Sequence, residues 1–170
     1  MIQVKVYSLA VDEKNQFPVV ILQSLDGSKQ LPIWIGPPEA SAIAMEIAGK
    51  KFQRPLTHDL LVSLVQSLGA KVLRVEIVDL KESTFYARIY LEAAGQTIVV
   101  DARPSDSLAI ALKAKAKIYV APNLFSSEIE SLLKPETEAE AVEPSDDERA
   151  RRLRREIEEM NLRDFGRYSM

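Results

Sequence analysis

The stretch from Phe52 to Leu61 reads Phe-Gln-Arg-Pro-Leu-Thr-His-Asp-Leu-Leu, contains the only histidine of the chain and opens its predicted central helix. Apolar residues continue from it at helical spacing, so a helix over 58–68 is expected to bury one face. The apolar stripe consists of Leu60, Leu61, Leu64, Val65 and Leu68. Since the chain shows a similar order of elements on both sides of this helix, the helix is expected to join two halves of one domain.

Several polar groups are concentrated at the start of this helix. Thr57 is a favourable N-cap residue, and His58 and Asp59 follow it. Arg54 lies just upstream and is held extended by Pro55. An anion or an acidic substrate could therefore be bound by Arg54 and by the free backbone N–H groups of the first turn. In the alternative interpretation Thr57 caps the helix, Asp59 complements the helix dipole and His58 is a surface residue.

The two halves follow the same predicted order of strand, strand, strand and helix. The first half has strands at 2–11, 18–23 and 30–35, and then a helical period from Gly36-Pro37-Pro38 to Gly49. The second half has a strand through Val72 and Ile77, strands at 85–91 and 97–100, and a helix that opens at Arg103-Pro104. A short strand at 117–120 and a helix at 126–133 are expected to complete the domain.

A shift of 65 positions aligns the two halves, with Ile33-Trp34-Ile35 on Ile98-Val99-Val100 and Ile43-Ala44 on Leu108-Ala109. We interpret this match as a degenerate internal duplication. The predicted fold class is therefore α+β, with two similar β-meander-plus-helix halves that form one domain.

The two halves differ in the polar residues at the junction between the third strand and the helix. Gly36 aligns with Asp101 and Ser41 aligns with Asp106, so only the second half carries paired carboxylates there. Such a junction is rigid and suits a functional site. The alternative is that Asp106 only accompanies a helix N-terminus and Asp101 only ends a strand.

Composition excludes several classes of protein. The chain has 170 residues, 46% of them hydrophobic, which suits a single domain with an appendage. It has no cysteine and one histidine, which excludes disulfides and thiolate chemistry and makes a histidine-rich zinc site improbable. No apolar run approaches the ~20 residues of a membrane span, and Met1 leads directly into a strand pattern. A cytoplasmic protein without membrane contact is expected.

Charge is distributed unevenly along the chain. Residues 1–134 contain 15 Lys and Arg against 14 Asp and Glu, a balance of +1, whereas residues 135–170 contain 7 against 11, a balance of −4. Residues 1–134 are thus predicted to form the globular domain and residues 135–145 an acidic linker. Residues 146–170 are predicted to form an Arg-rich amphipathic helix and tail, which either docks on the domain, pairs between chains or contacts an anionic partner.

Three stretches in this order resemble the bifunctional nuclease domain family, whose members in bacteria and plants are described as acting on both DNA and RNA. They are Leu-Pro-Ile-Trp-Ile-Gly-Pro-Pro-Glu-Ala at 31–40, Arg-Pro-Leu-Thr-His-Asp-Leu at 54–60 and Asp-Ala-Arg-Pro-Ser-Asp-Ser-Leu-Ala at 101–109. The resemblance covers roughly residues 1–134. It implies one polar site that is built from Glu39, Arg54, Thr57, His58, Asp59, Asp101, Arg103, Ser105 and Asp106.

The resemblance also implies roles for these residues in phosphodiester hydrolysis. His58, Asp59, Asp101 and Asp106 are the expected catalytic residues, with His58 as general base or acid. Mg²⁺ or Mn²⁺ is expected on the hard oxygen ligands of Asp101 and Asp106, with Glu39 as a further ligand. The substrate is expected to be bound by Arg54, Arg103, Thr57 and Ser105, with the two arginines on its phosphate.

A second function remains open from the sequence. The chain has an aromatic content of only 6% and the domain has little net charge, so it offers few stacking platforms for bases and a weak electrostatic attraction for nucleic acid. The same charged residues could instead form a structural salt-bridge network in a regulatory or protein-interaction domain. A homodimer or a higher homo-oligomer is expected in either case, because a sheet covered by helices on one face has a second face to bury.

Overall fold

The computed structural model describes residues 1–12 and 16–125, which form a seven-stranded mixed sheet with three α-helices. The predicted helix at 126–133, the acidic linker and the Arg-rich helix lie outside the described residues. The strands are β1 (Ile2–Val11), β2 (Pro18–Ser24), β3 (Gln30–Trp34), β4 (Ala70–Lys81), β5 (Thr84–Ala93), β6 (Gln96–Ala102) and β7 (Lys117–Val120). The helices are α1 (Pro37–Ile47), α2 (Thr57–Ser67) and α3 (Pro104–Ala114), and a 3₁₀ turn spans Pro122–Phe125.

The strand order in the sheet is β3-β2-β1-β7-β4-β5-β6. Each half of the chain contributes an antiparallel meander followed by a helix. The last strand, β7, joins the two meanders, because it pairs antiparallel with β1 and parallel with β4. The predicted α+β class and the predicted element order are confirmed, whereas the origin of the halves by duplication stays a prediction.

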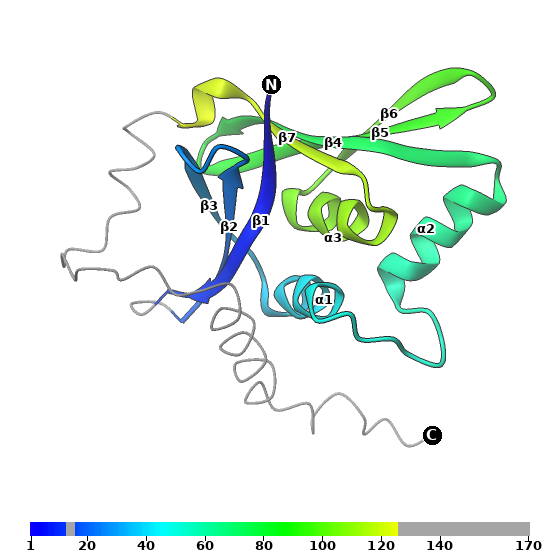
Figure 1. Cartoon of the computed structure of the whole chain (residues 1–170), viewed down its shortest axis with the longest axis horizontal. Helices are drawn as coiled ribbons and strands as arrows, with labels where there is room; N and C mark the ends of the chain where they lie inside the picture. Colours follow the sequence, from blue (N-terminus) through cyan, green and yellow to red (C-terminus); the bar gives the residue numbers. More distant parts are fainter. Residues whose placement is uncertain (13–15, 126–170) are drawn as a thin grey trace. The chain divides into compact units, whose positions relative to one another are not determined.

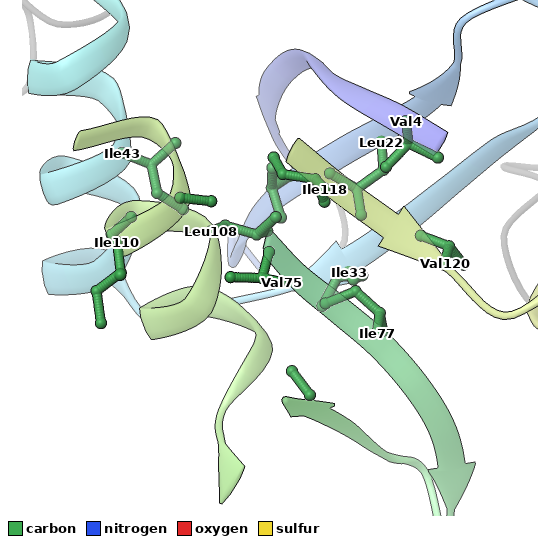
Figure 2. Packing of buried hydrophobic residues seen from close by; sticks show 14 of the residues in the cluster. Val4, Leu22, Ile33, Ile43, Val75, Ile77, Leu108, Ile110, Ile118 and Val120 are labelled. Carbon is green, nitrogen blue, oxygen red and sulfur yellow. The ribbon is translucent and has the colours of Figure 1, made fainter. Parts of the chain in front are cut away.

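The three helices lie along one face of the sheet, with α3 between α1 and α2 (Figure 1). Figure 2 shows the core that α3 forms with the strands, where Leu108 meets Val75 and Ile118. Alanines at 109 and 111 are buried on the same helix, and their small side chains allow a close approach of α3 to its neighbours. The core therefore positions α3 more rigidly than the two flanking helices.

The start of α2 differs from the prediction. Leu56 occupies the N-cap position and Thr57 is the first helical residue, so the assignment of Thr57 as N-cap is wrong. The backbone N–H of Leu56 donates to Asp59 Oδ2 at 2.9 Å. This bond from the third helical residue satisfies the N–H of the N-cap residue, as the acidic residue of a capping box does.

The uncovered face of the sheet is polar in its second half. Val75 and Ile77 face the helices, so strand alternation directs Arg74 and Glu76 to the opposite face. Arg74 Nε donates to Glu76 Oε1 at 2.7 Å, and its guanidinium lies 3.8 Å from the ring centre of Tyr90. This half of the uncovered face is therefore polar, and it offers little apolar area for self-association.

Ser107 provides a test of the packing of α3. Its side chain is fully buried, and its hydroxyl has no hydrogen-bond partner among the described residues. Because an unpaired buried hydroxyl costs about 1–3 kcal/mol, Ser107→Ala is expected to leave the melting temperature unchanged or to raise it. The neighbouring Leu108→Ala is the control and should lower stability by about 2–5 kcal/mol. A lower melting temperature for Ser107→Ala would show that the hydroxyl makes a stabilising bond.

Candidate functional site

The first turn of α3 is organised by Arg103 and Asp106. Arg103 stands at the N-cap of this helix in an extended conformation, and Pro104 occupies the first helical position, where no N–H is needed. Arg103 donates through Nε to Asp106 Oδ2 at 2.7 Å and through Nη2 to Asp106 Oδ1 at 3.2 Å. This two-point contact fixes the orientation of the guanidinium plane.

His58 brings the start of α2 to the same carboxylate. Its Nε2 lies 3.3 Å from Asp106 Oδ1, and 13% of the His58 side chain is exposed. Burial favours the neutral form of Asp106, but the hydrogen bonds from Arg103 and His58 outweigh it and keep the pKa of Asp106 below its ordinary value of 3.8. The predicted meeting of the central helix with the second strand-to-helix junction is thus present, across 48 residues of chain.

Glu39 adds a residue from α1. Its Oε1 lies 2.9 Å from Arg103 Nη2, and 17% of its side chain is exposed. The carboxylate folds back over the start of its own helix, where a β-carbon on Gly36 would come within 2.3 Å of Glu39 Oε2. Because Gly36 has no β-carbon, the Glu39 carboxylate can occupy this space. We call Glu39, His58, Arg103 and Asp106 the helix-start cluster.

A cavity of about 330 Å³ lies beside the helix-start cluster. The N-cap residues of α1 and α3, Gly36 and Arg103, both line it. The remaining lining comes from the end of β3, the helix starts and the turn between β4 and β5: Ile33, Trp34, Ile35, Glu39, Ser83, Thr84, Phe85, Pro104 and Ser105. A polar ligand in this cavity would meet a guanidinium and the positive ends of two helix dipoles.

Asp59 is not part of the helix-start cluster and belongs to a second network of ion pairs, which is centred on Lys113. It accepts from Lys113 Nζ through Oδ1 at 2.5 Å, and Lys113 also donates to Glu46 Oε2 at 3.0 Å. The hydrogen bond from Lys113 lowers the pKa of Asp59, and burial of the carboxyl only partly opposes it. Only 11% of the Lys113 side chain is exposed, so this ammonium connects α1, α2 and α3 from within the protein.

Other predicted site residues are not brought to the cluster. Asp101 lies on β6 opposite Arg88 of β5, whereas its neighbour Ala102 lies opposite the buried Ala87. Successive strand residues point to opposite faces, so Asp101 lies on the sheet face away from Asp106. Arg54 is exposed in the loop before α2, and Thr57 is exposed at its first position. Ser105 is buried and lines the cavity.

The expected metal ligands do not converge in the described part of the chain. Within residues 1–12 and 16–125, no group of three or more His, Asp or Glu side chains is arranged to hold a metal ion. Glu39 and Asp106 both contact Arg103, whose guanidinium occupies the space between them. The arrangement of these ligands therefore does not fit the three-carboxylate site that the sequence suggested, and the need for a divalent ion stays a prediction.

Glu46 and Lys113 were not among the predicted site residues. Glu46 follows Glu39 by seven positions on α1, and Lys113 follows Asp106 by seven positions on α3. Residues seven apart lie on the same face of a helix, two turns from each other. This spacing was a usable signal that each helix carries a polar edge, although it could not show that the two edges meet.

The geometry and the three motifs agree with a comparison against known families. Residues 20–132 match the bifunctional nuclease domain. The chain belongs to this family. The match covers α1, α2 and α3 and includes every member of the helix-start cluster.

None of the described helices is both long enough and apolar enough to cross a membrane.

Relatives of this family member fall into two groups. An uncharacterized protein of Mycobacterium tuberculosis is 47% identical over 118 residues, which are 69% of this chain and 70% of the relative. Bifunctional nuclease 1 of Oryza sativa subsp. indica is 28% identical over 59% of this chain, and Bifunctional nuclease 2 of subsp. japonica is 26% identical over 69%. The matched regions are 32% and 38% of these two plant proteins, so the plant chains extend well beyond the shared domain.

Asp59→Asn tests the second network and its pH dependence. The variant is expected to lower the free energy of unfolding by about 1–2 kcal/mol at neutral pH, since Lys113 loses a charged acceptor. The pKa of Asp59 is lowered in the folded state, so its contribution is complete above pH 3.8 and is lost as pH falls through the lower folded value. Urea unfolding at neutral pH and well below pH 3.8 should show a gap between variant and wild type that closes in acid.

Asp101→Asn serves as the control in this experiment, because Asp101 lies on the opposite face of the sheet. A gap for Asp59→Asn that persists unchanged in acid would contradict the electrostatic explanation.

Proposed function

We propose that this domain hydrolyses phosphodiester bonds of DNA, RNA or both, with low sequence specificity, at the helix-start cluster and its cavity. The observation that carries the proposal is a chain of side-chain contacts in which His58 contacts Asp106, Asp106 contacts Arg103 and Arg103 contacts Glu39. Arg103 and Glu39 also line a cavity at the N-termini of α1 and α3. Membership of the family and the nuclease names of the rice relatives support the same reaction class.

Arg103 is the proposed phosphate-binding residue. Its side chain is 66% exposed although it contacts both Glu39 and Asp106. A guanidinium has five N–H donors in a fixed plane, so it keeps donors for a phosphate while the two carboxylates hold it in place. The negative charge that develops on the phosphoryl oxygens would be stabilised by this cation and by the helix N-termini at Gly36 and Arg103. Ser105 lines the same cavity and is the proposed hydroxyl contact.

His58 is the proposed proton-transfer residue. Its Nε2 contacts Asp106, which leaves Nδ1 for a water molecule or a substrate oxygen. Asp106 then orients the imidazole, as a carboxylate does for a catalytic histidine in other hydrolases. Glu39 acts as a positioning residue, because it reaches the reacting groups only through Arg103. No step of this scheme uses Asp59 or Asp101.

A non-catalytic function is the second candidate, and a specific observation favours it. Among the described residues, each carboxylate of the helix-start cluster is bonded to Arg103, and Asp59 and Glu46 are bonded to Lys113. Ion pairs of this kind connect the three helices and are typical of structural networks. In this case the domain would bind a partner without cleaving it, and the cluster would contribute to stability alone.

His58→Gln separates the two candidates. The proposed mechanism predicts a loss of nuclease activity of about 10²–10⁴-fold, because proton transfer is removed, with a small change in melting temperature. Asp101→Asn is the matched control and should retain full activity. Cleavage of fluorescent DNA and RNA substrates and thermal unfolding should be measured on the same preparations. Activity that persists in His58→Gln but disappears in Asp101→Asn would reverse the assignment of the two residues.

The expected role of a divalent ion has its own test. Cleavage should stop in the presence of EDTA and return when Mg²⁺ or Mn²⁺ is added in excess, if hard-oxygen ligands bind the ion together with the substrate phosphate. Thermal unfolding without substrate should be measured in parallel with and without each ion. Full activity in EDTA would refute the metal requirement while leaving the roles of His58 and Arg103 intact.

A further inference from the structure

Exposed apolar side chains of this domain are concentrated on α2 and β6. On α2, Leu60 and Leu64 are each 50% exposed and Leu68, just after the helix, is 82% exposed, so the prediction that these leucines are buried is wrong. On β6 three consecutive residues, Ile98, Val99 and Val100, are 40–50% exposed. Contiguous apolar surface of this kind marks an interaction site more often than scattered single residues do.

An apolar groove connects the two elements. Its volume is about 190 Å³, and it lies between α2 and the second meander of the sheet. Its lining residues are Leu61, Val62 and Val65 of α2, Val72, Ile89, Leu91 and Val100 of the strands, and Ile110 of α3. Leu61 and Val100 belong both to the groove and to the exposed set, so α2, the groove and β6 form one surface, which we call the α2–β6 surface.

The strand β6 is an edge of the sheet without the usual protection of an edge. It is the last strand in the sheet order, so its outer backbone groups have no strand partner among the described residues. Gln96–Ala102 contains neither Lys nor Pro, whereas the opposite edge strand, β3, carries Pro32 at its centre. Lysine, proline and bulges are the features that keep edge strands from pairing with another chain.

The hairpin geometry shows which residues present their backbone at this edge. Ala94 and Gly95 form a two-residue turn with positive φ, and the Ala93–Gln96 pair closes the hairpin. Hydrogen-bonded pairs alternate from this point along an antiparallel ladder, so Gln96, Ile98 and Val100 bond to β5. The backbone groups of Thr97, Val99 and Asp101 therefore point to the open edge.

A second β6 fits this edge in antiparallel orientation about a two-fold axis at Val99. In that register Val99 lies opposite Val99 of the other copy, Ile98 opposite Val100, and Thr97 opposite Asp101. No two like charges meet, and each pair beside the groove is apolar. Alternation places Ile98 and Val100 on the helix face, the face on which α2 and the groove lie.

We propose that the α2–β6 surface binds a second copy of this chain, with the two β6 strands paired antiparallel about Val99. The sheets of the two copies then continue into one another, and the apolar grooves close against the partner's α2. A two-fold arrangement suits this surface because a symmetric dimer uses the same patch on both subunits. The proposal does not depend on the nuclease function, since the helix-start cluster shares no residue with this surface.

The first test is the mass of the full-length protein in solution. Light scattering at micromolar concentration is expected to give twice the chain mass of 19.0 kDa. Val99→Pro and Leu64→Lys should each reduce the mass to that of one chain, because the first removes an outward N–H and the second places a charge on the apolar surface. Leu25→Lys is the control, since Leu25 is 58% exposed in the turn between β2 and β3 and should leave the mass unchanged.

Thermal unfolding of each variant confirms that it is folded before its mass is interpreted. Hydrogen exchange then tests the register: in the wild type the amides of Thr97, Val99 and Asp101 should be protected, and in Leu64→Lys they should exchange rapidly. A wild-type mass of one chain overturns the proposal. A dimer that persists in both Val99→Pro and Leu64→Lys also overturns it, because the chains would then associate through another segment. A wild-type dimer in which these three amides exchange freely overturns it as well.

Discussion

The burial of α3 between the sheet and the two other helices is the constraint on which the core and the candidate site both depend. Leu108, Ala109 and Ala111 are each at most 1% exposed, so the helix can neither rotate nor slide without a loss of packing. With α3 held in this way, Arg103 and Lys113 occupy defined positions at its two ends. Each of these cations then bonds carboxylates that come from other helices.

The two cations have different surroundings, and this difference separates a structural role from a chemical one. Lys113 is almost buried, so its bonds to Glu46 and Asp59 connect three helices with an ammonium that is largely shielded from water. Arg103 is largely exposed at the edge of a cavity, so bulk water and a ligand can both reach it. The nuclease proposal therefore rests on Arg103 and His58, while Asp59 is assigned to stability.

The two halves of the domain contribute unequal parts to the same site. Both place a proline at the first helical position, and the N-cap residues of both helices line one cavity. The first half leaves Gly36 at its N-cap, which frees the space for the Glu39 carboxylate. The second half has Arg103 at its N-cap, so Gly36 corresponds in the structure to Arg103 and not to Asp101, and the guanidinium reaches across to Glu39. Two helices at corresponding places in the fold can in this way supply complementary charges.

The sequence by itself determined the elements, because periods of two and 3.6 residues are local properties of the chain. It also determined that Asp106 and His58 belong to helix starts, whereas their convergence was expected only from the family resemblance and is shown by the structure. Only the tertiary structure decided that Asp101 and Asp106 lie on different sides of the sheet, since strand register sets which face a residue occupies. It alone decided the partners of Lys113 and the position of β7 between the two meanders, because these contacts join segments that share no local pattern.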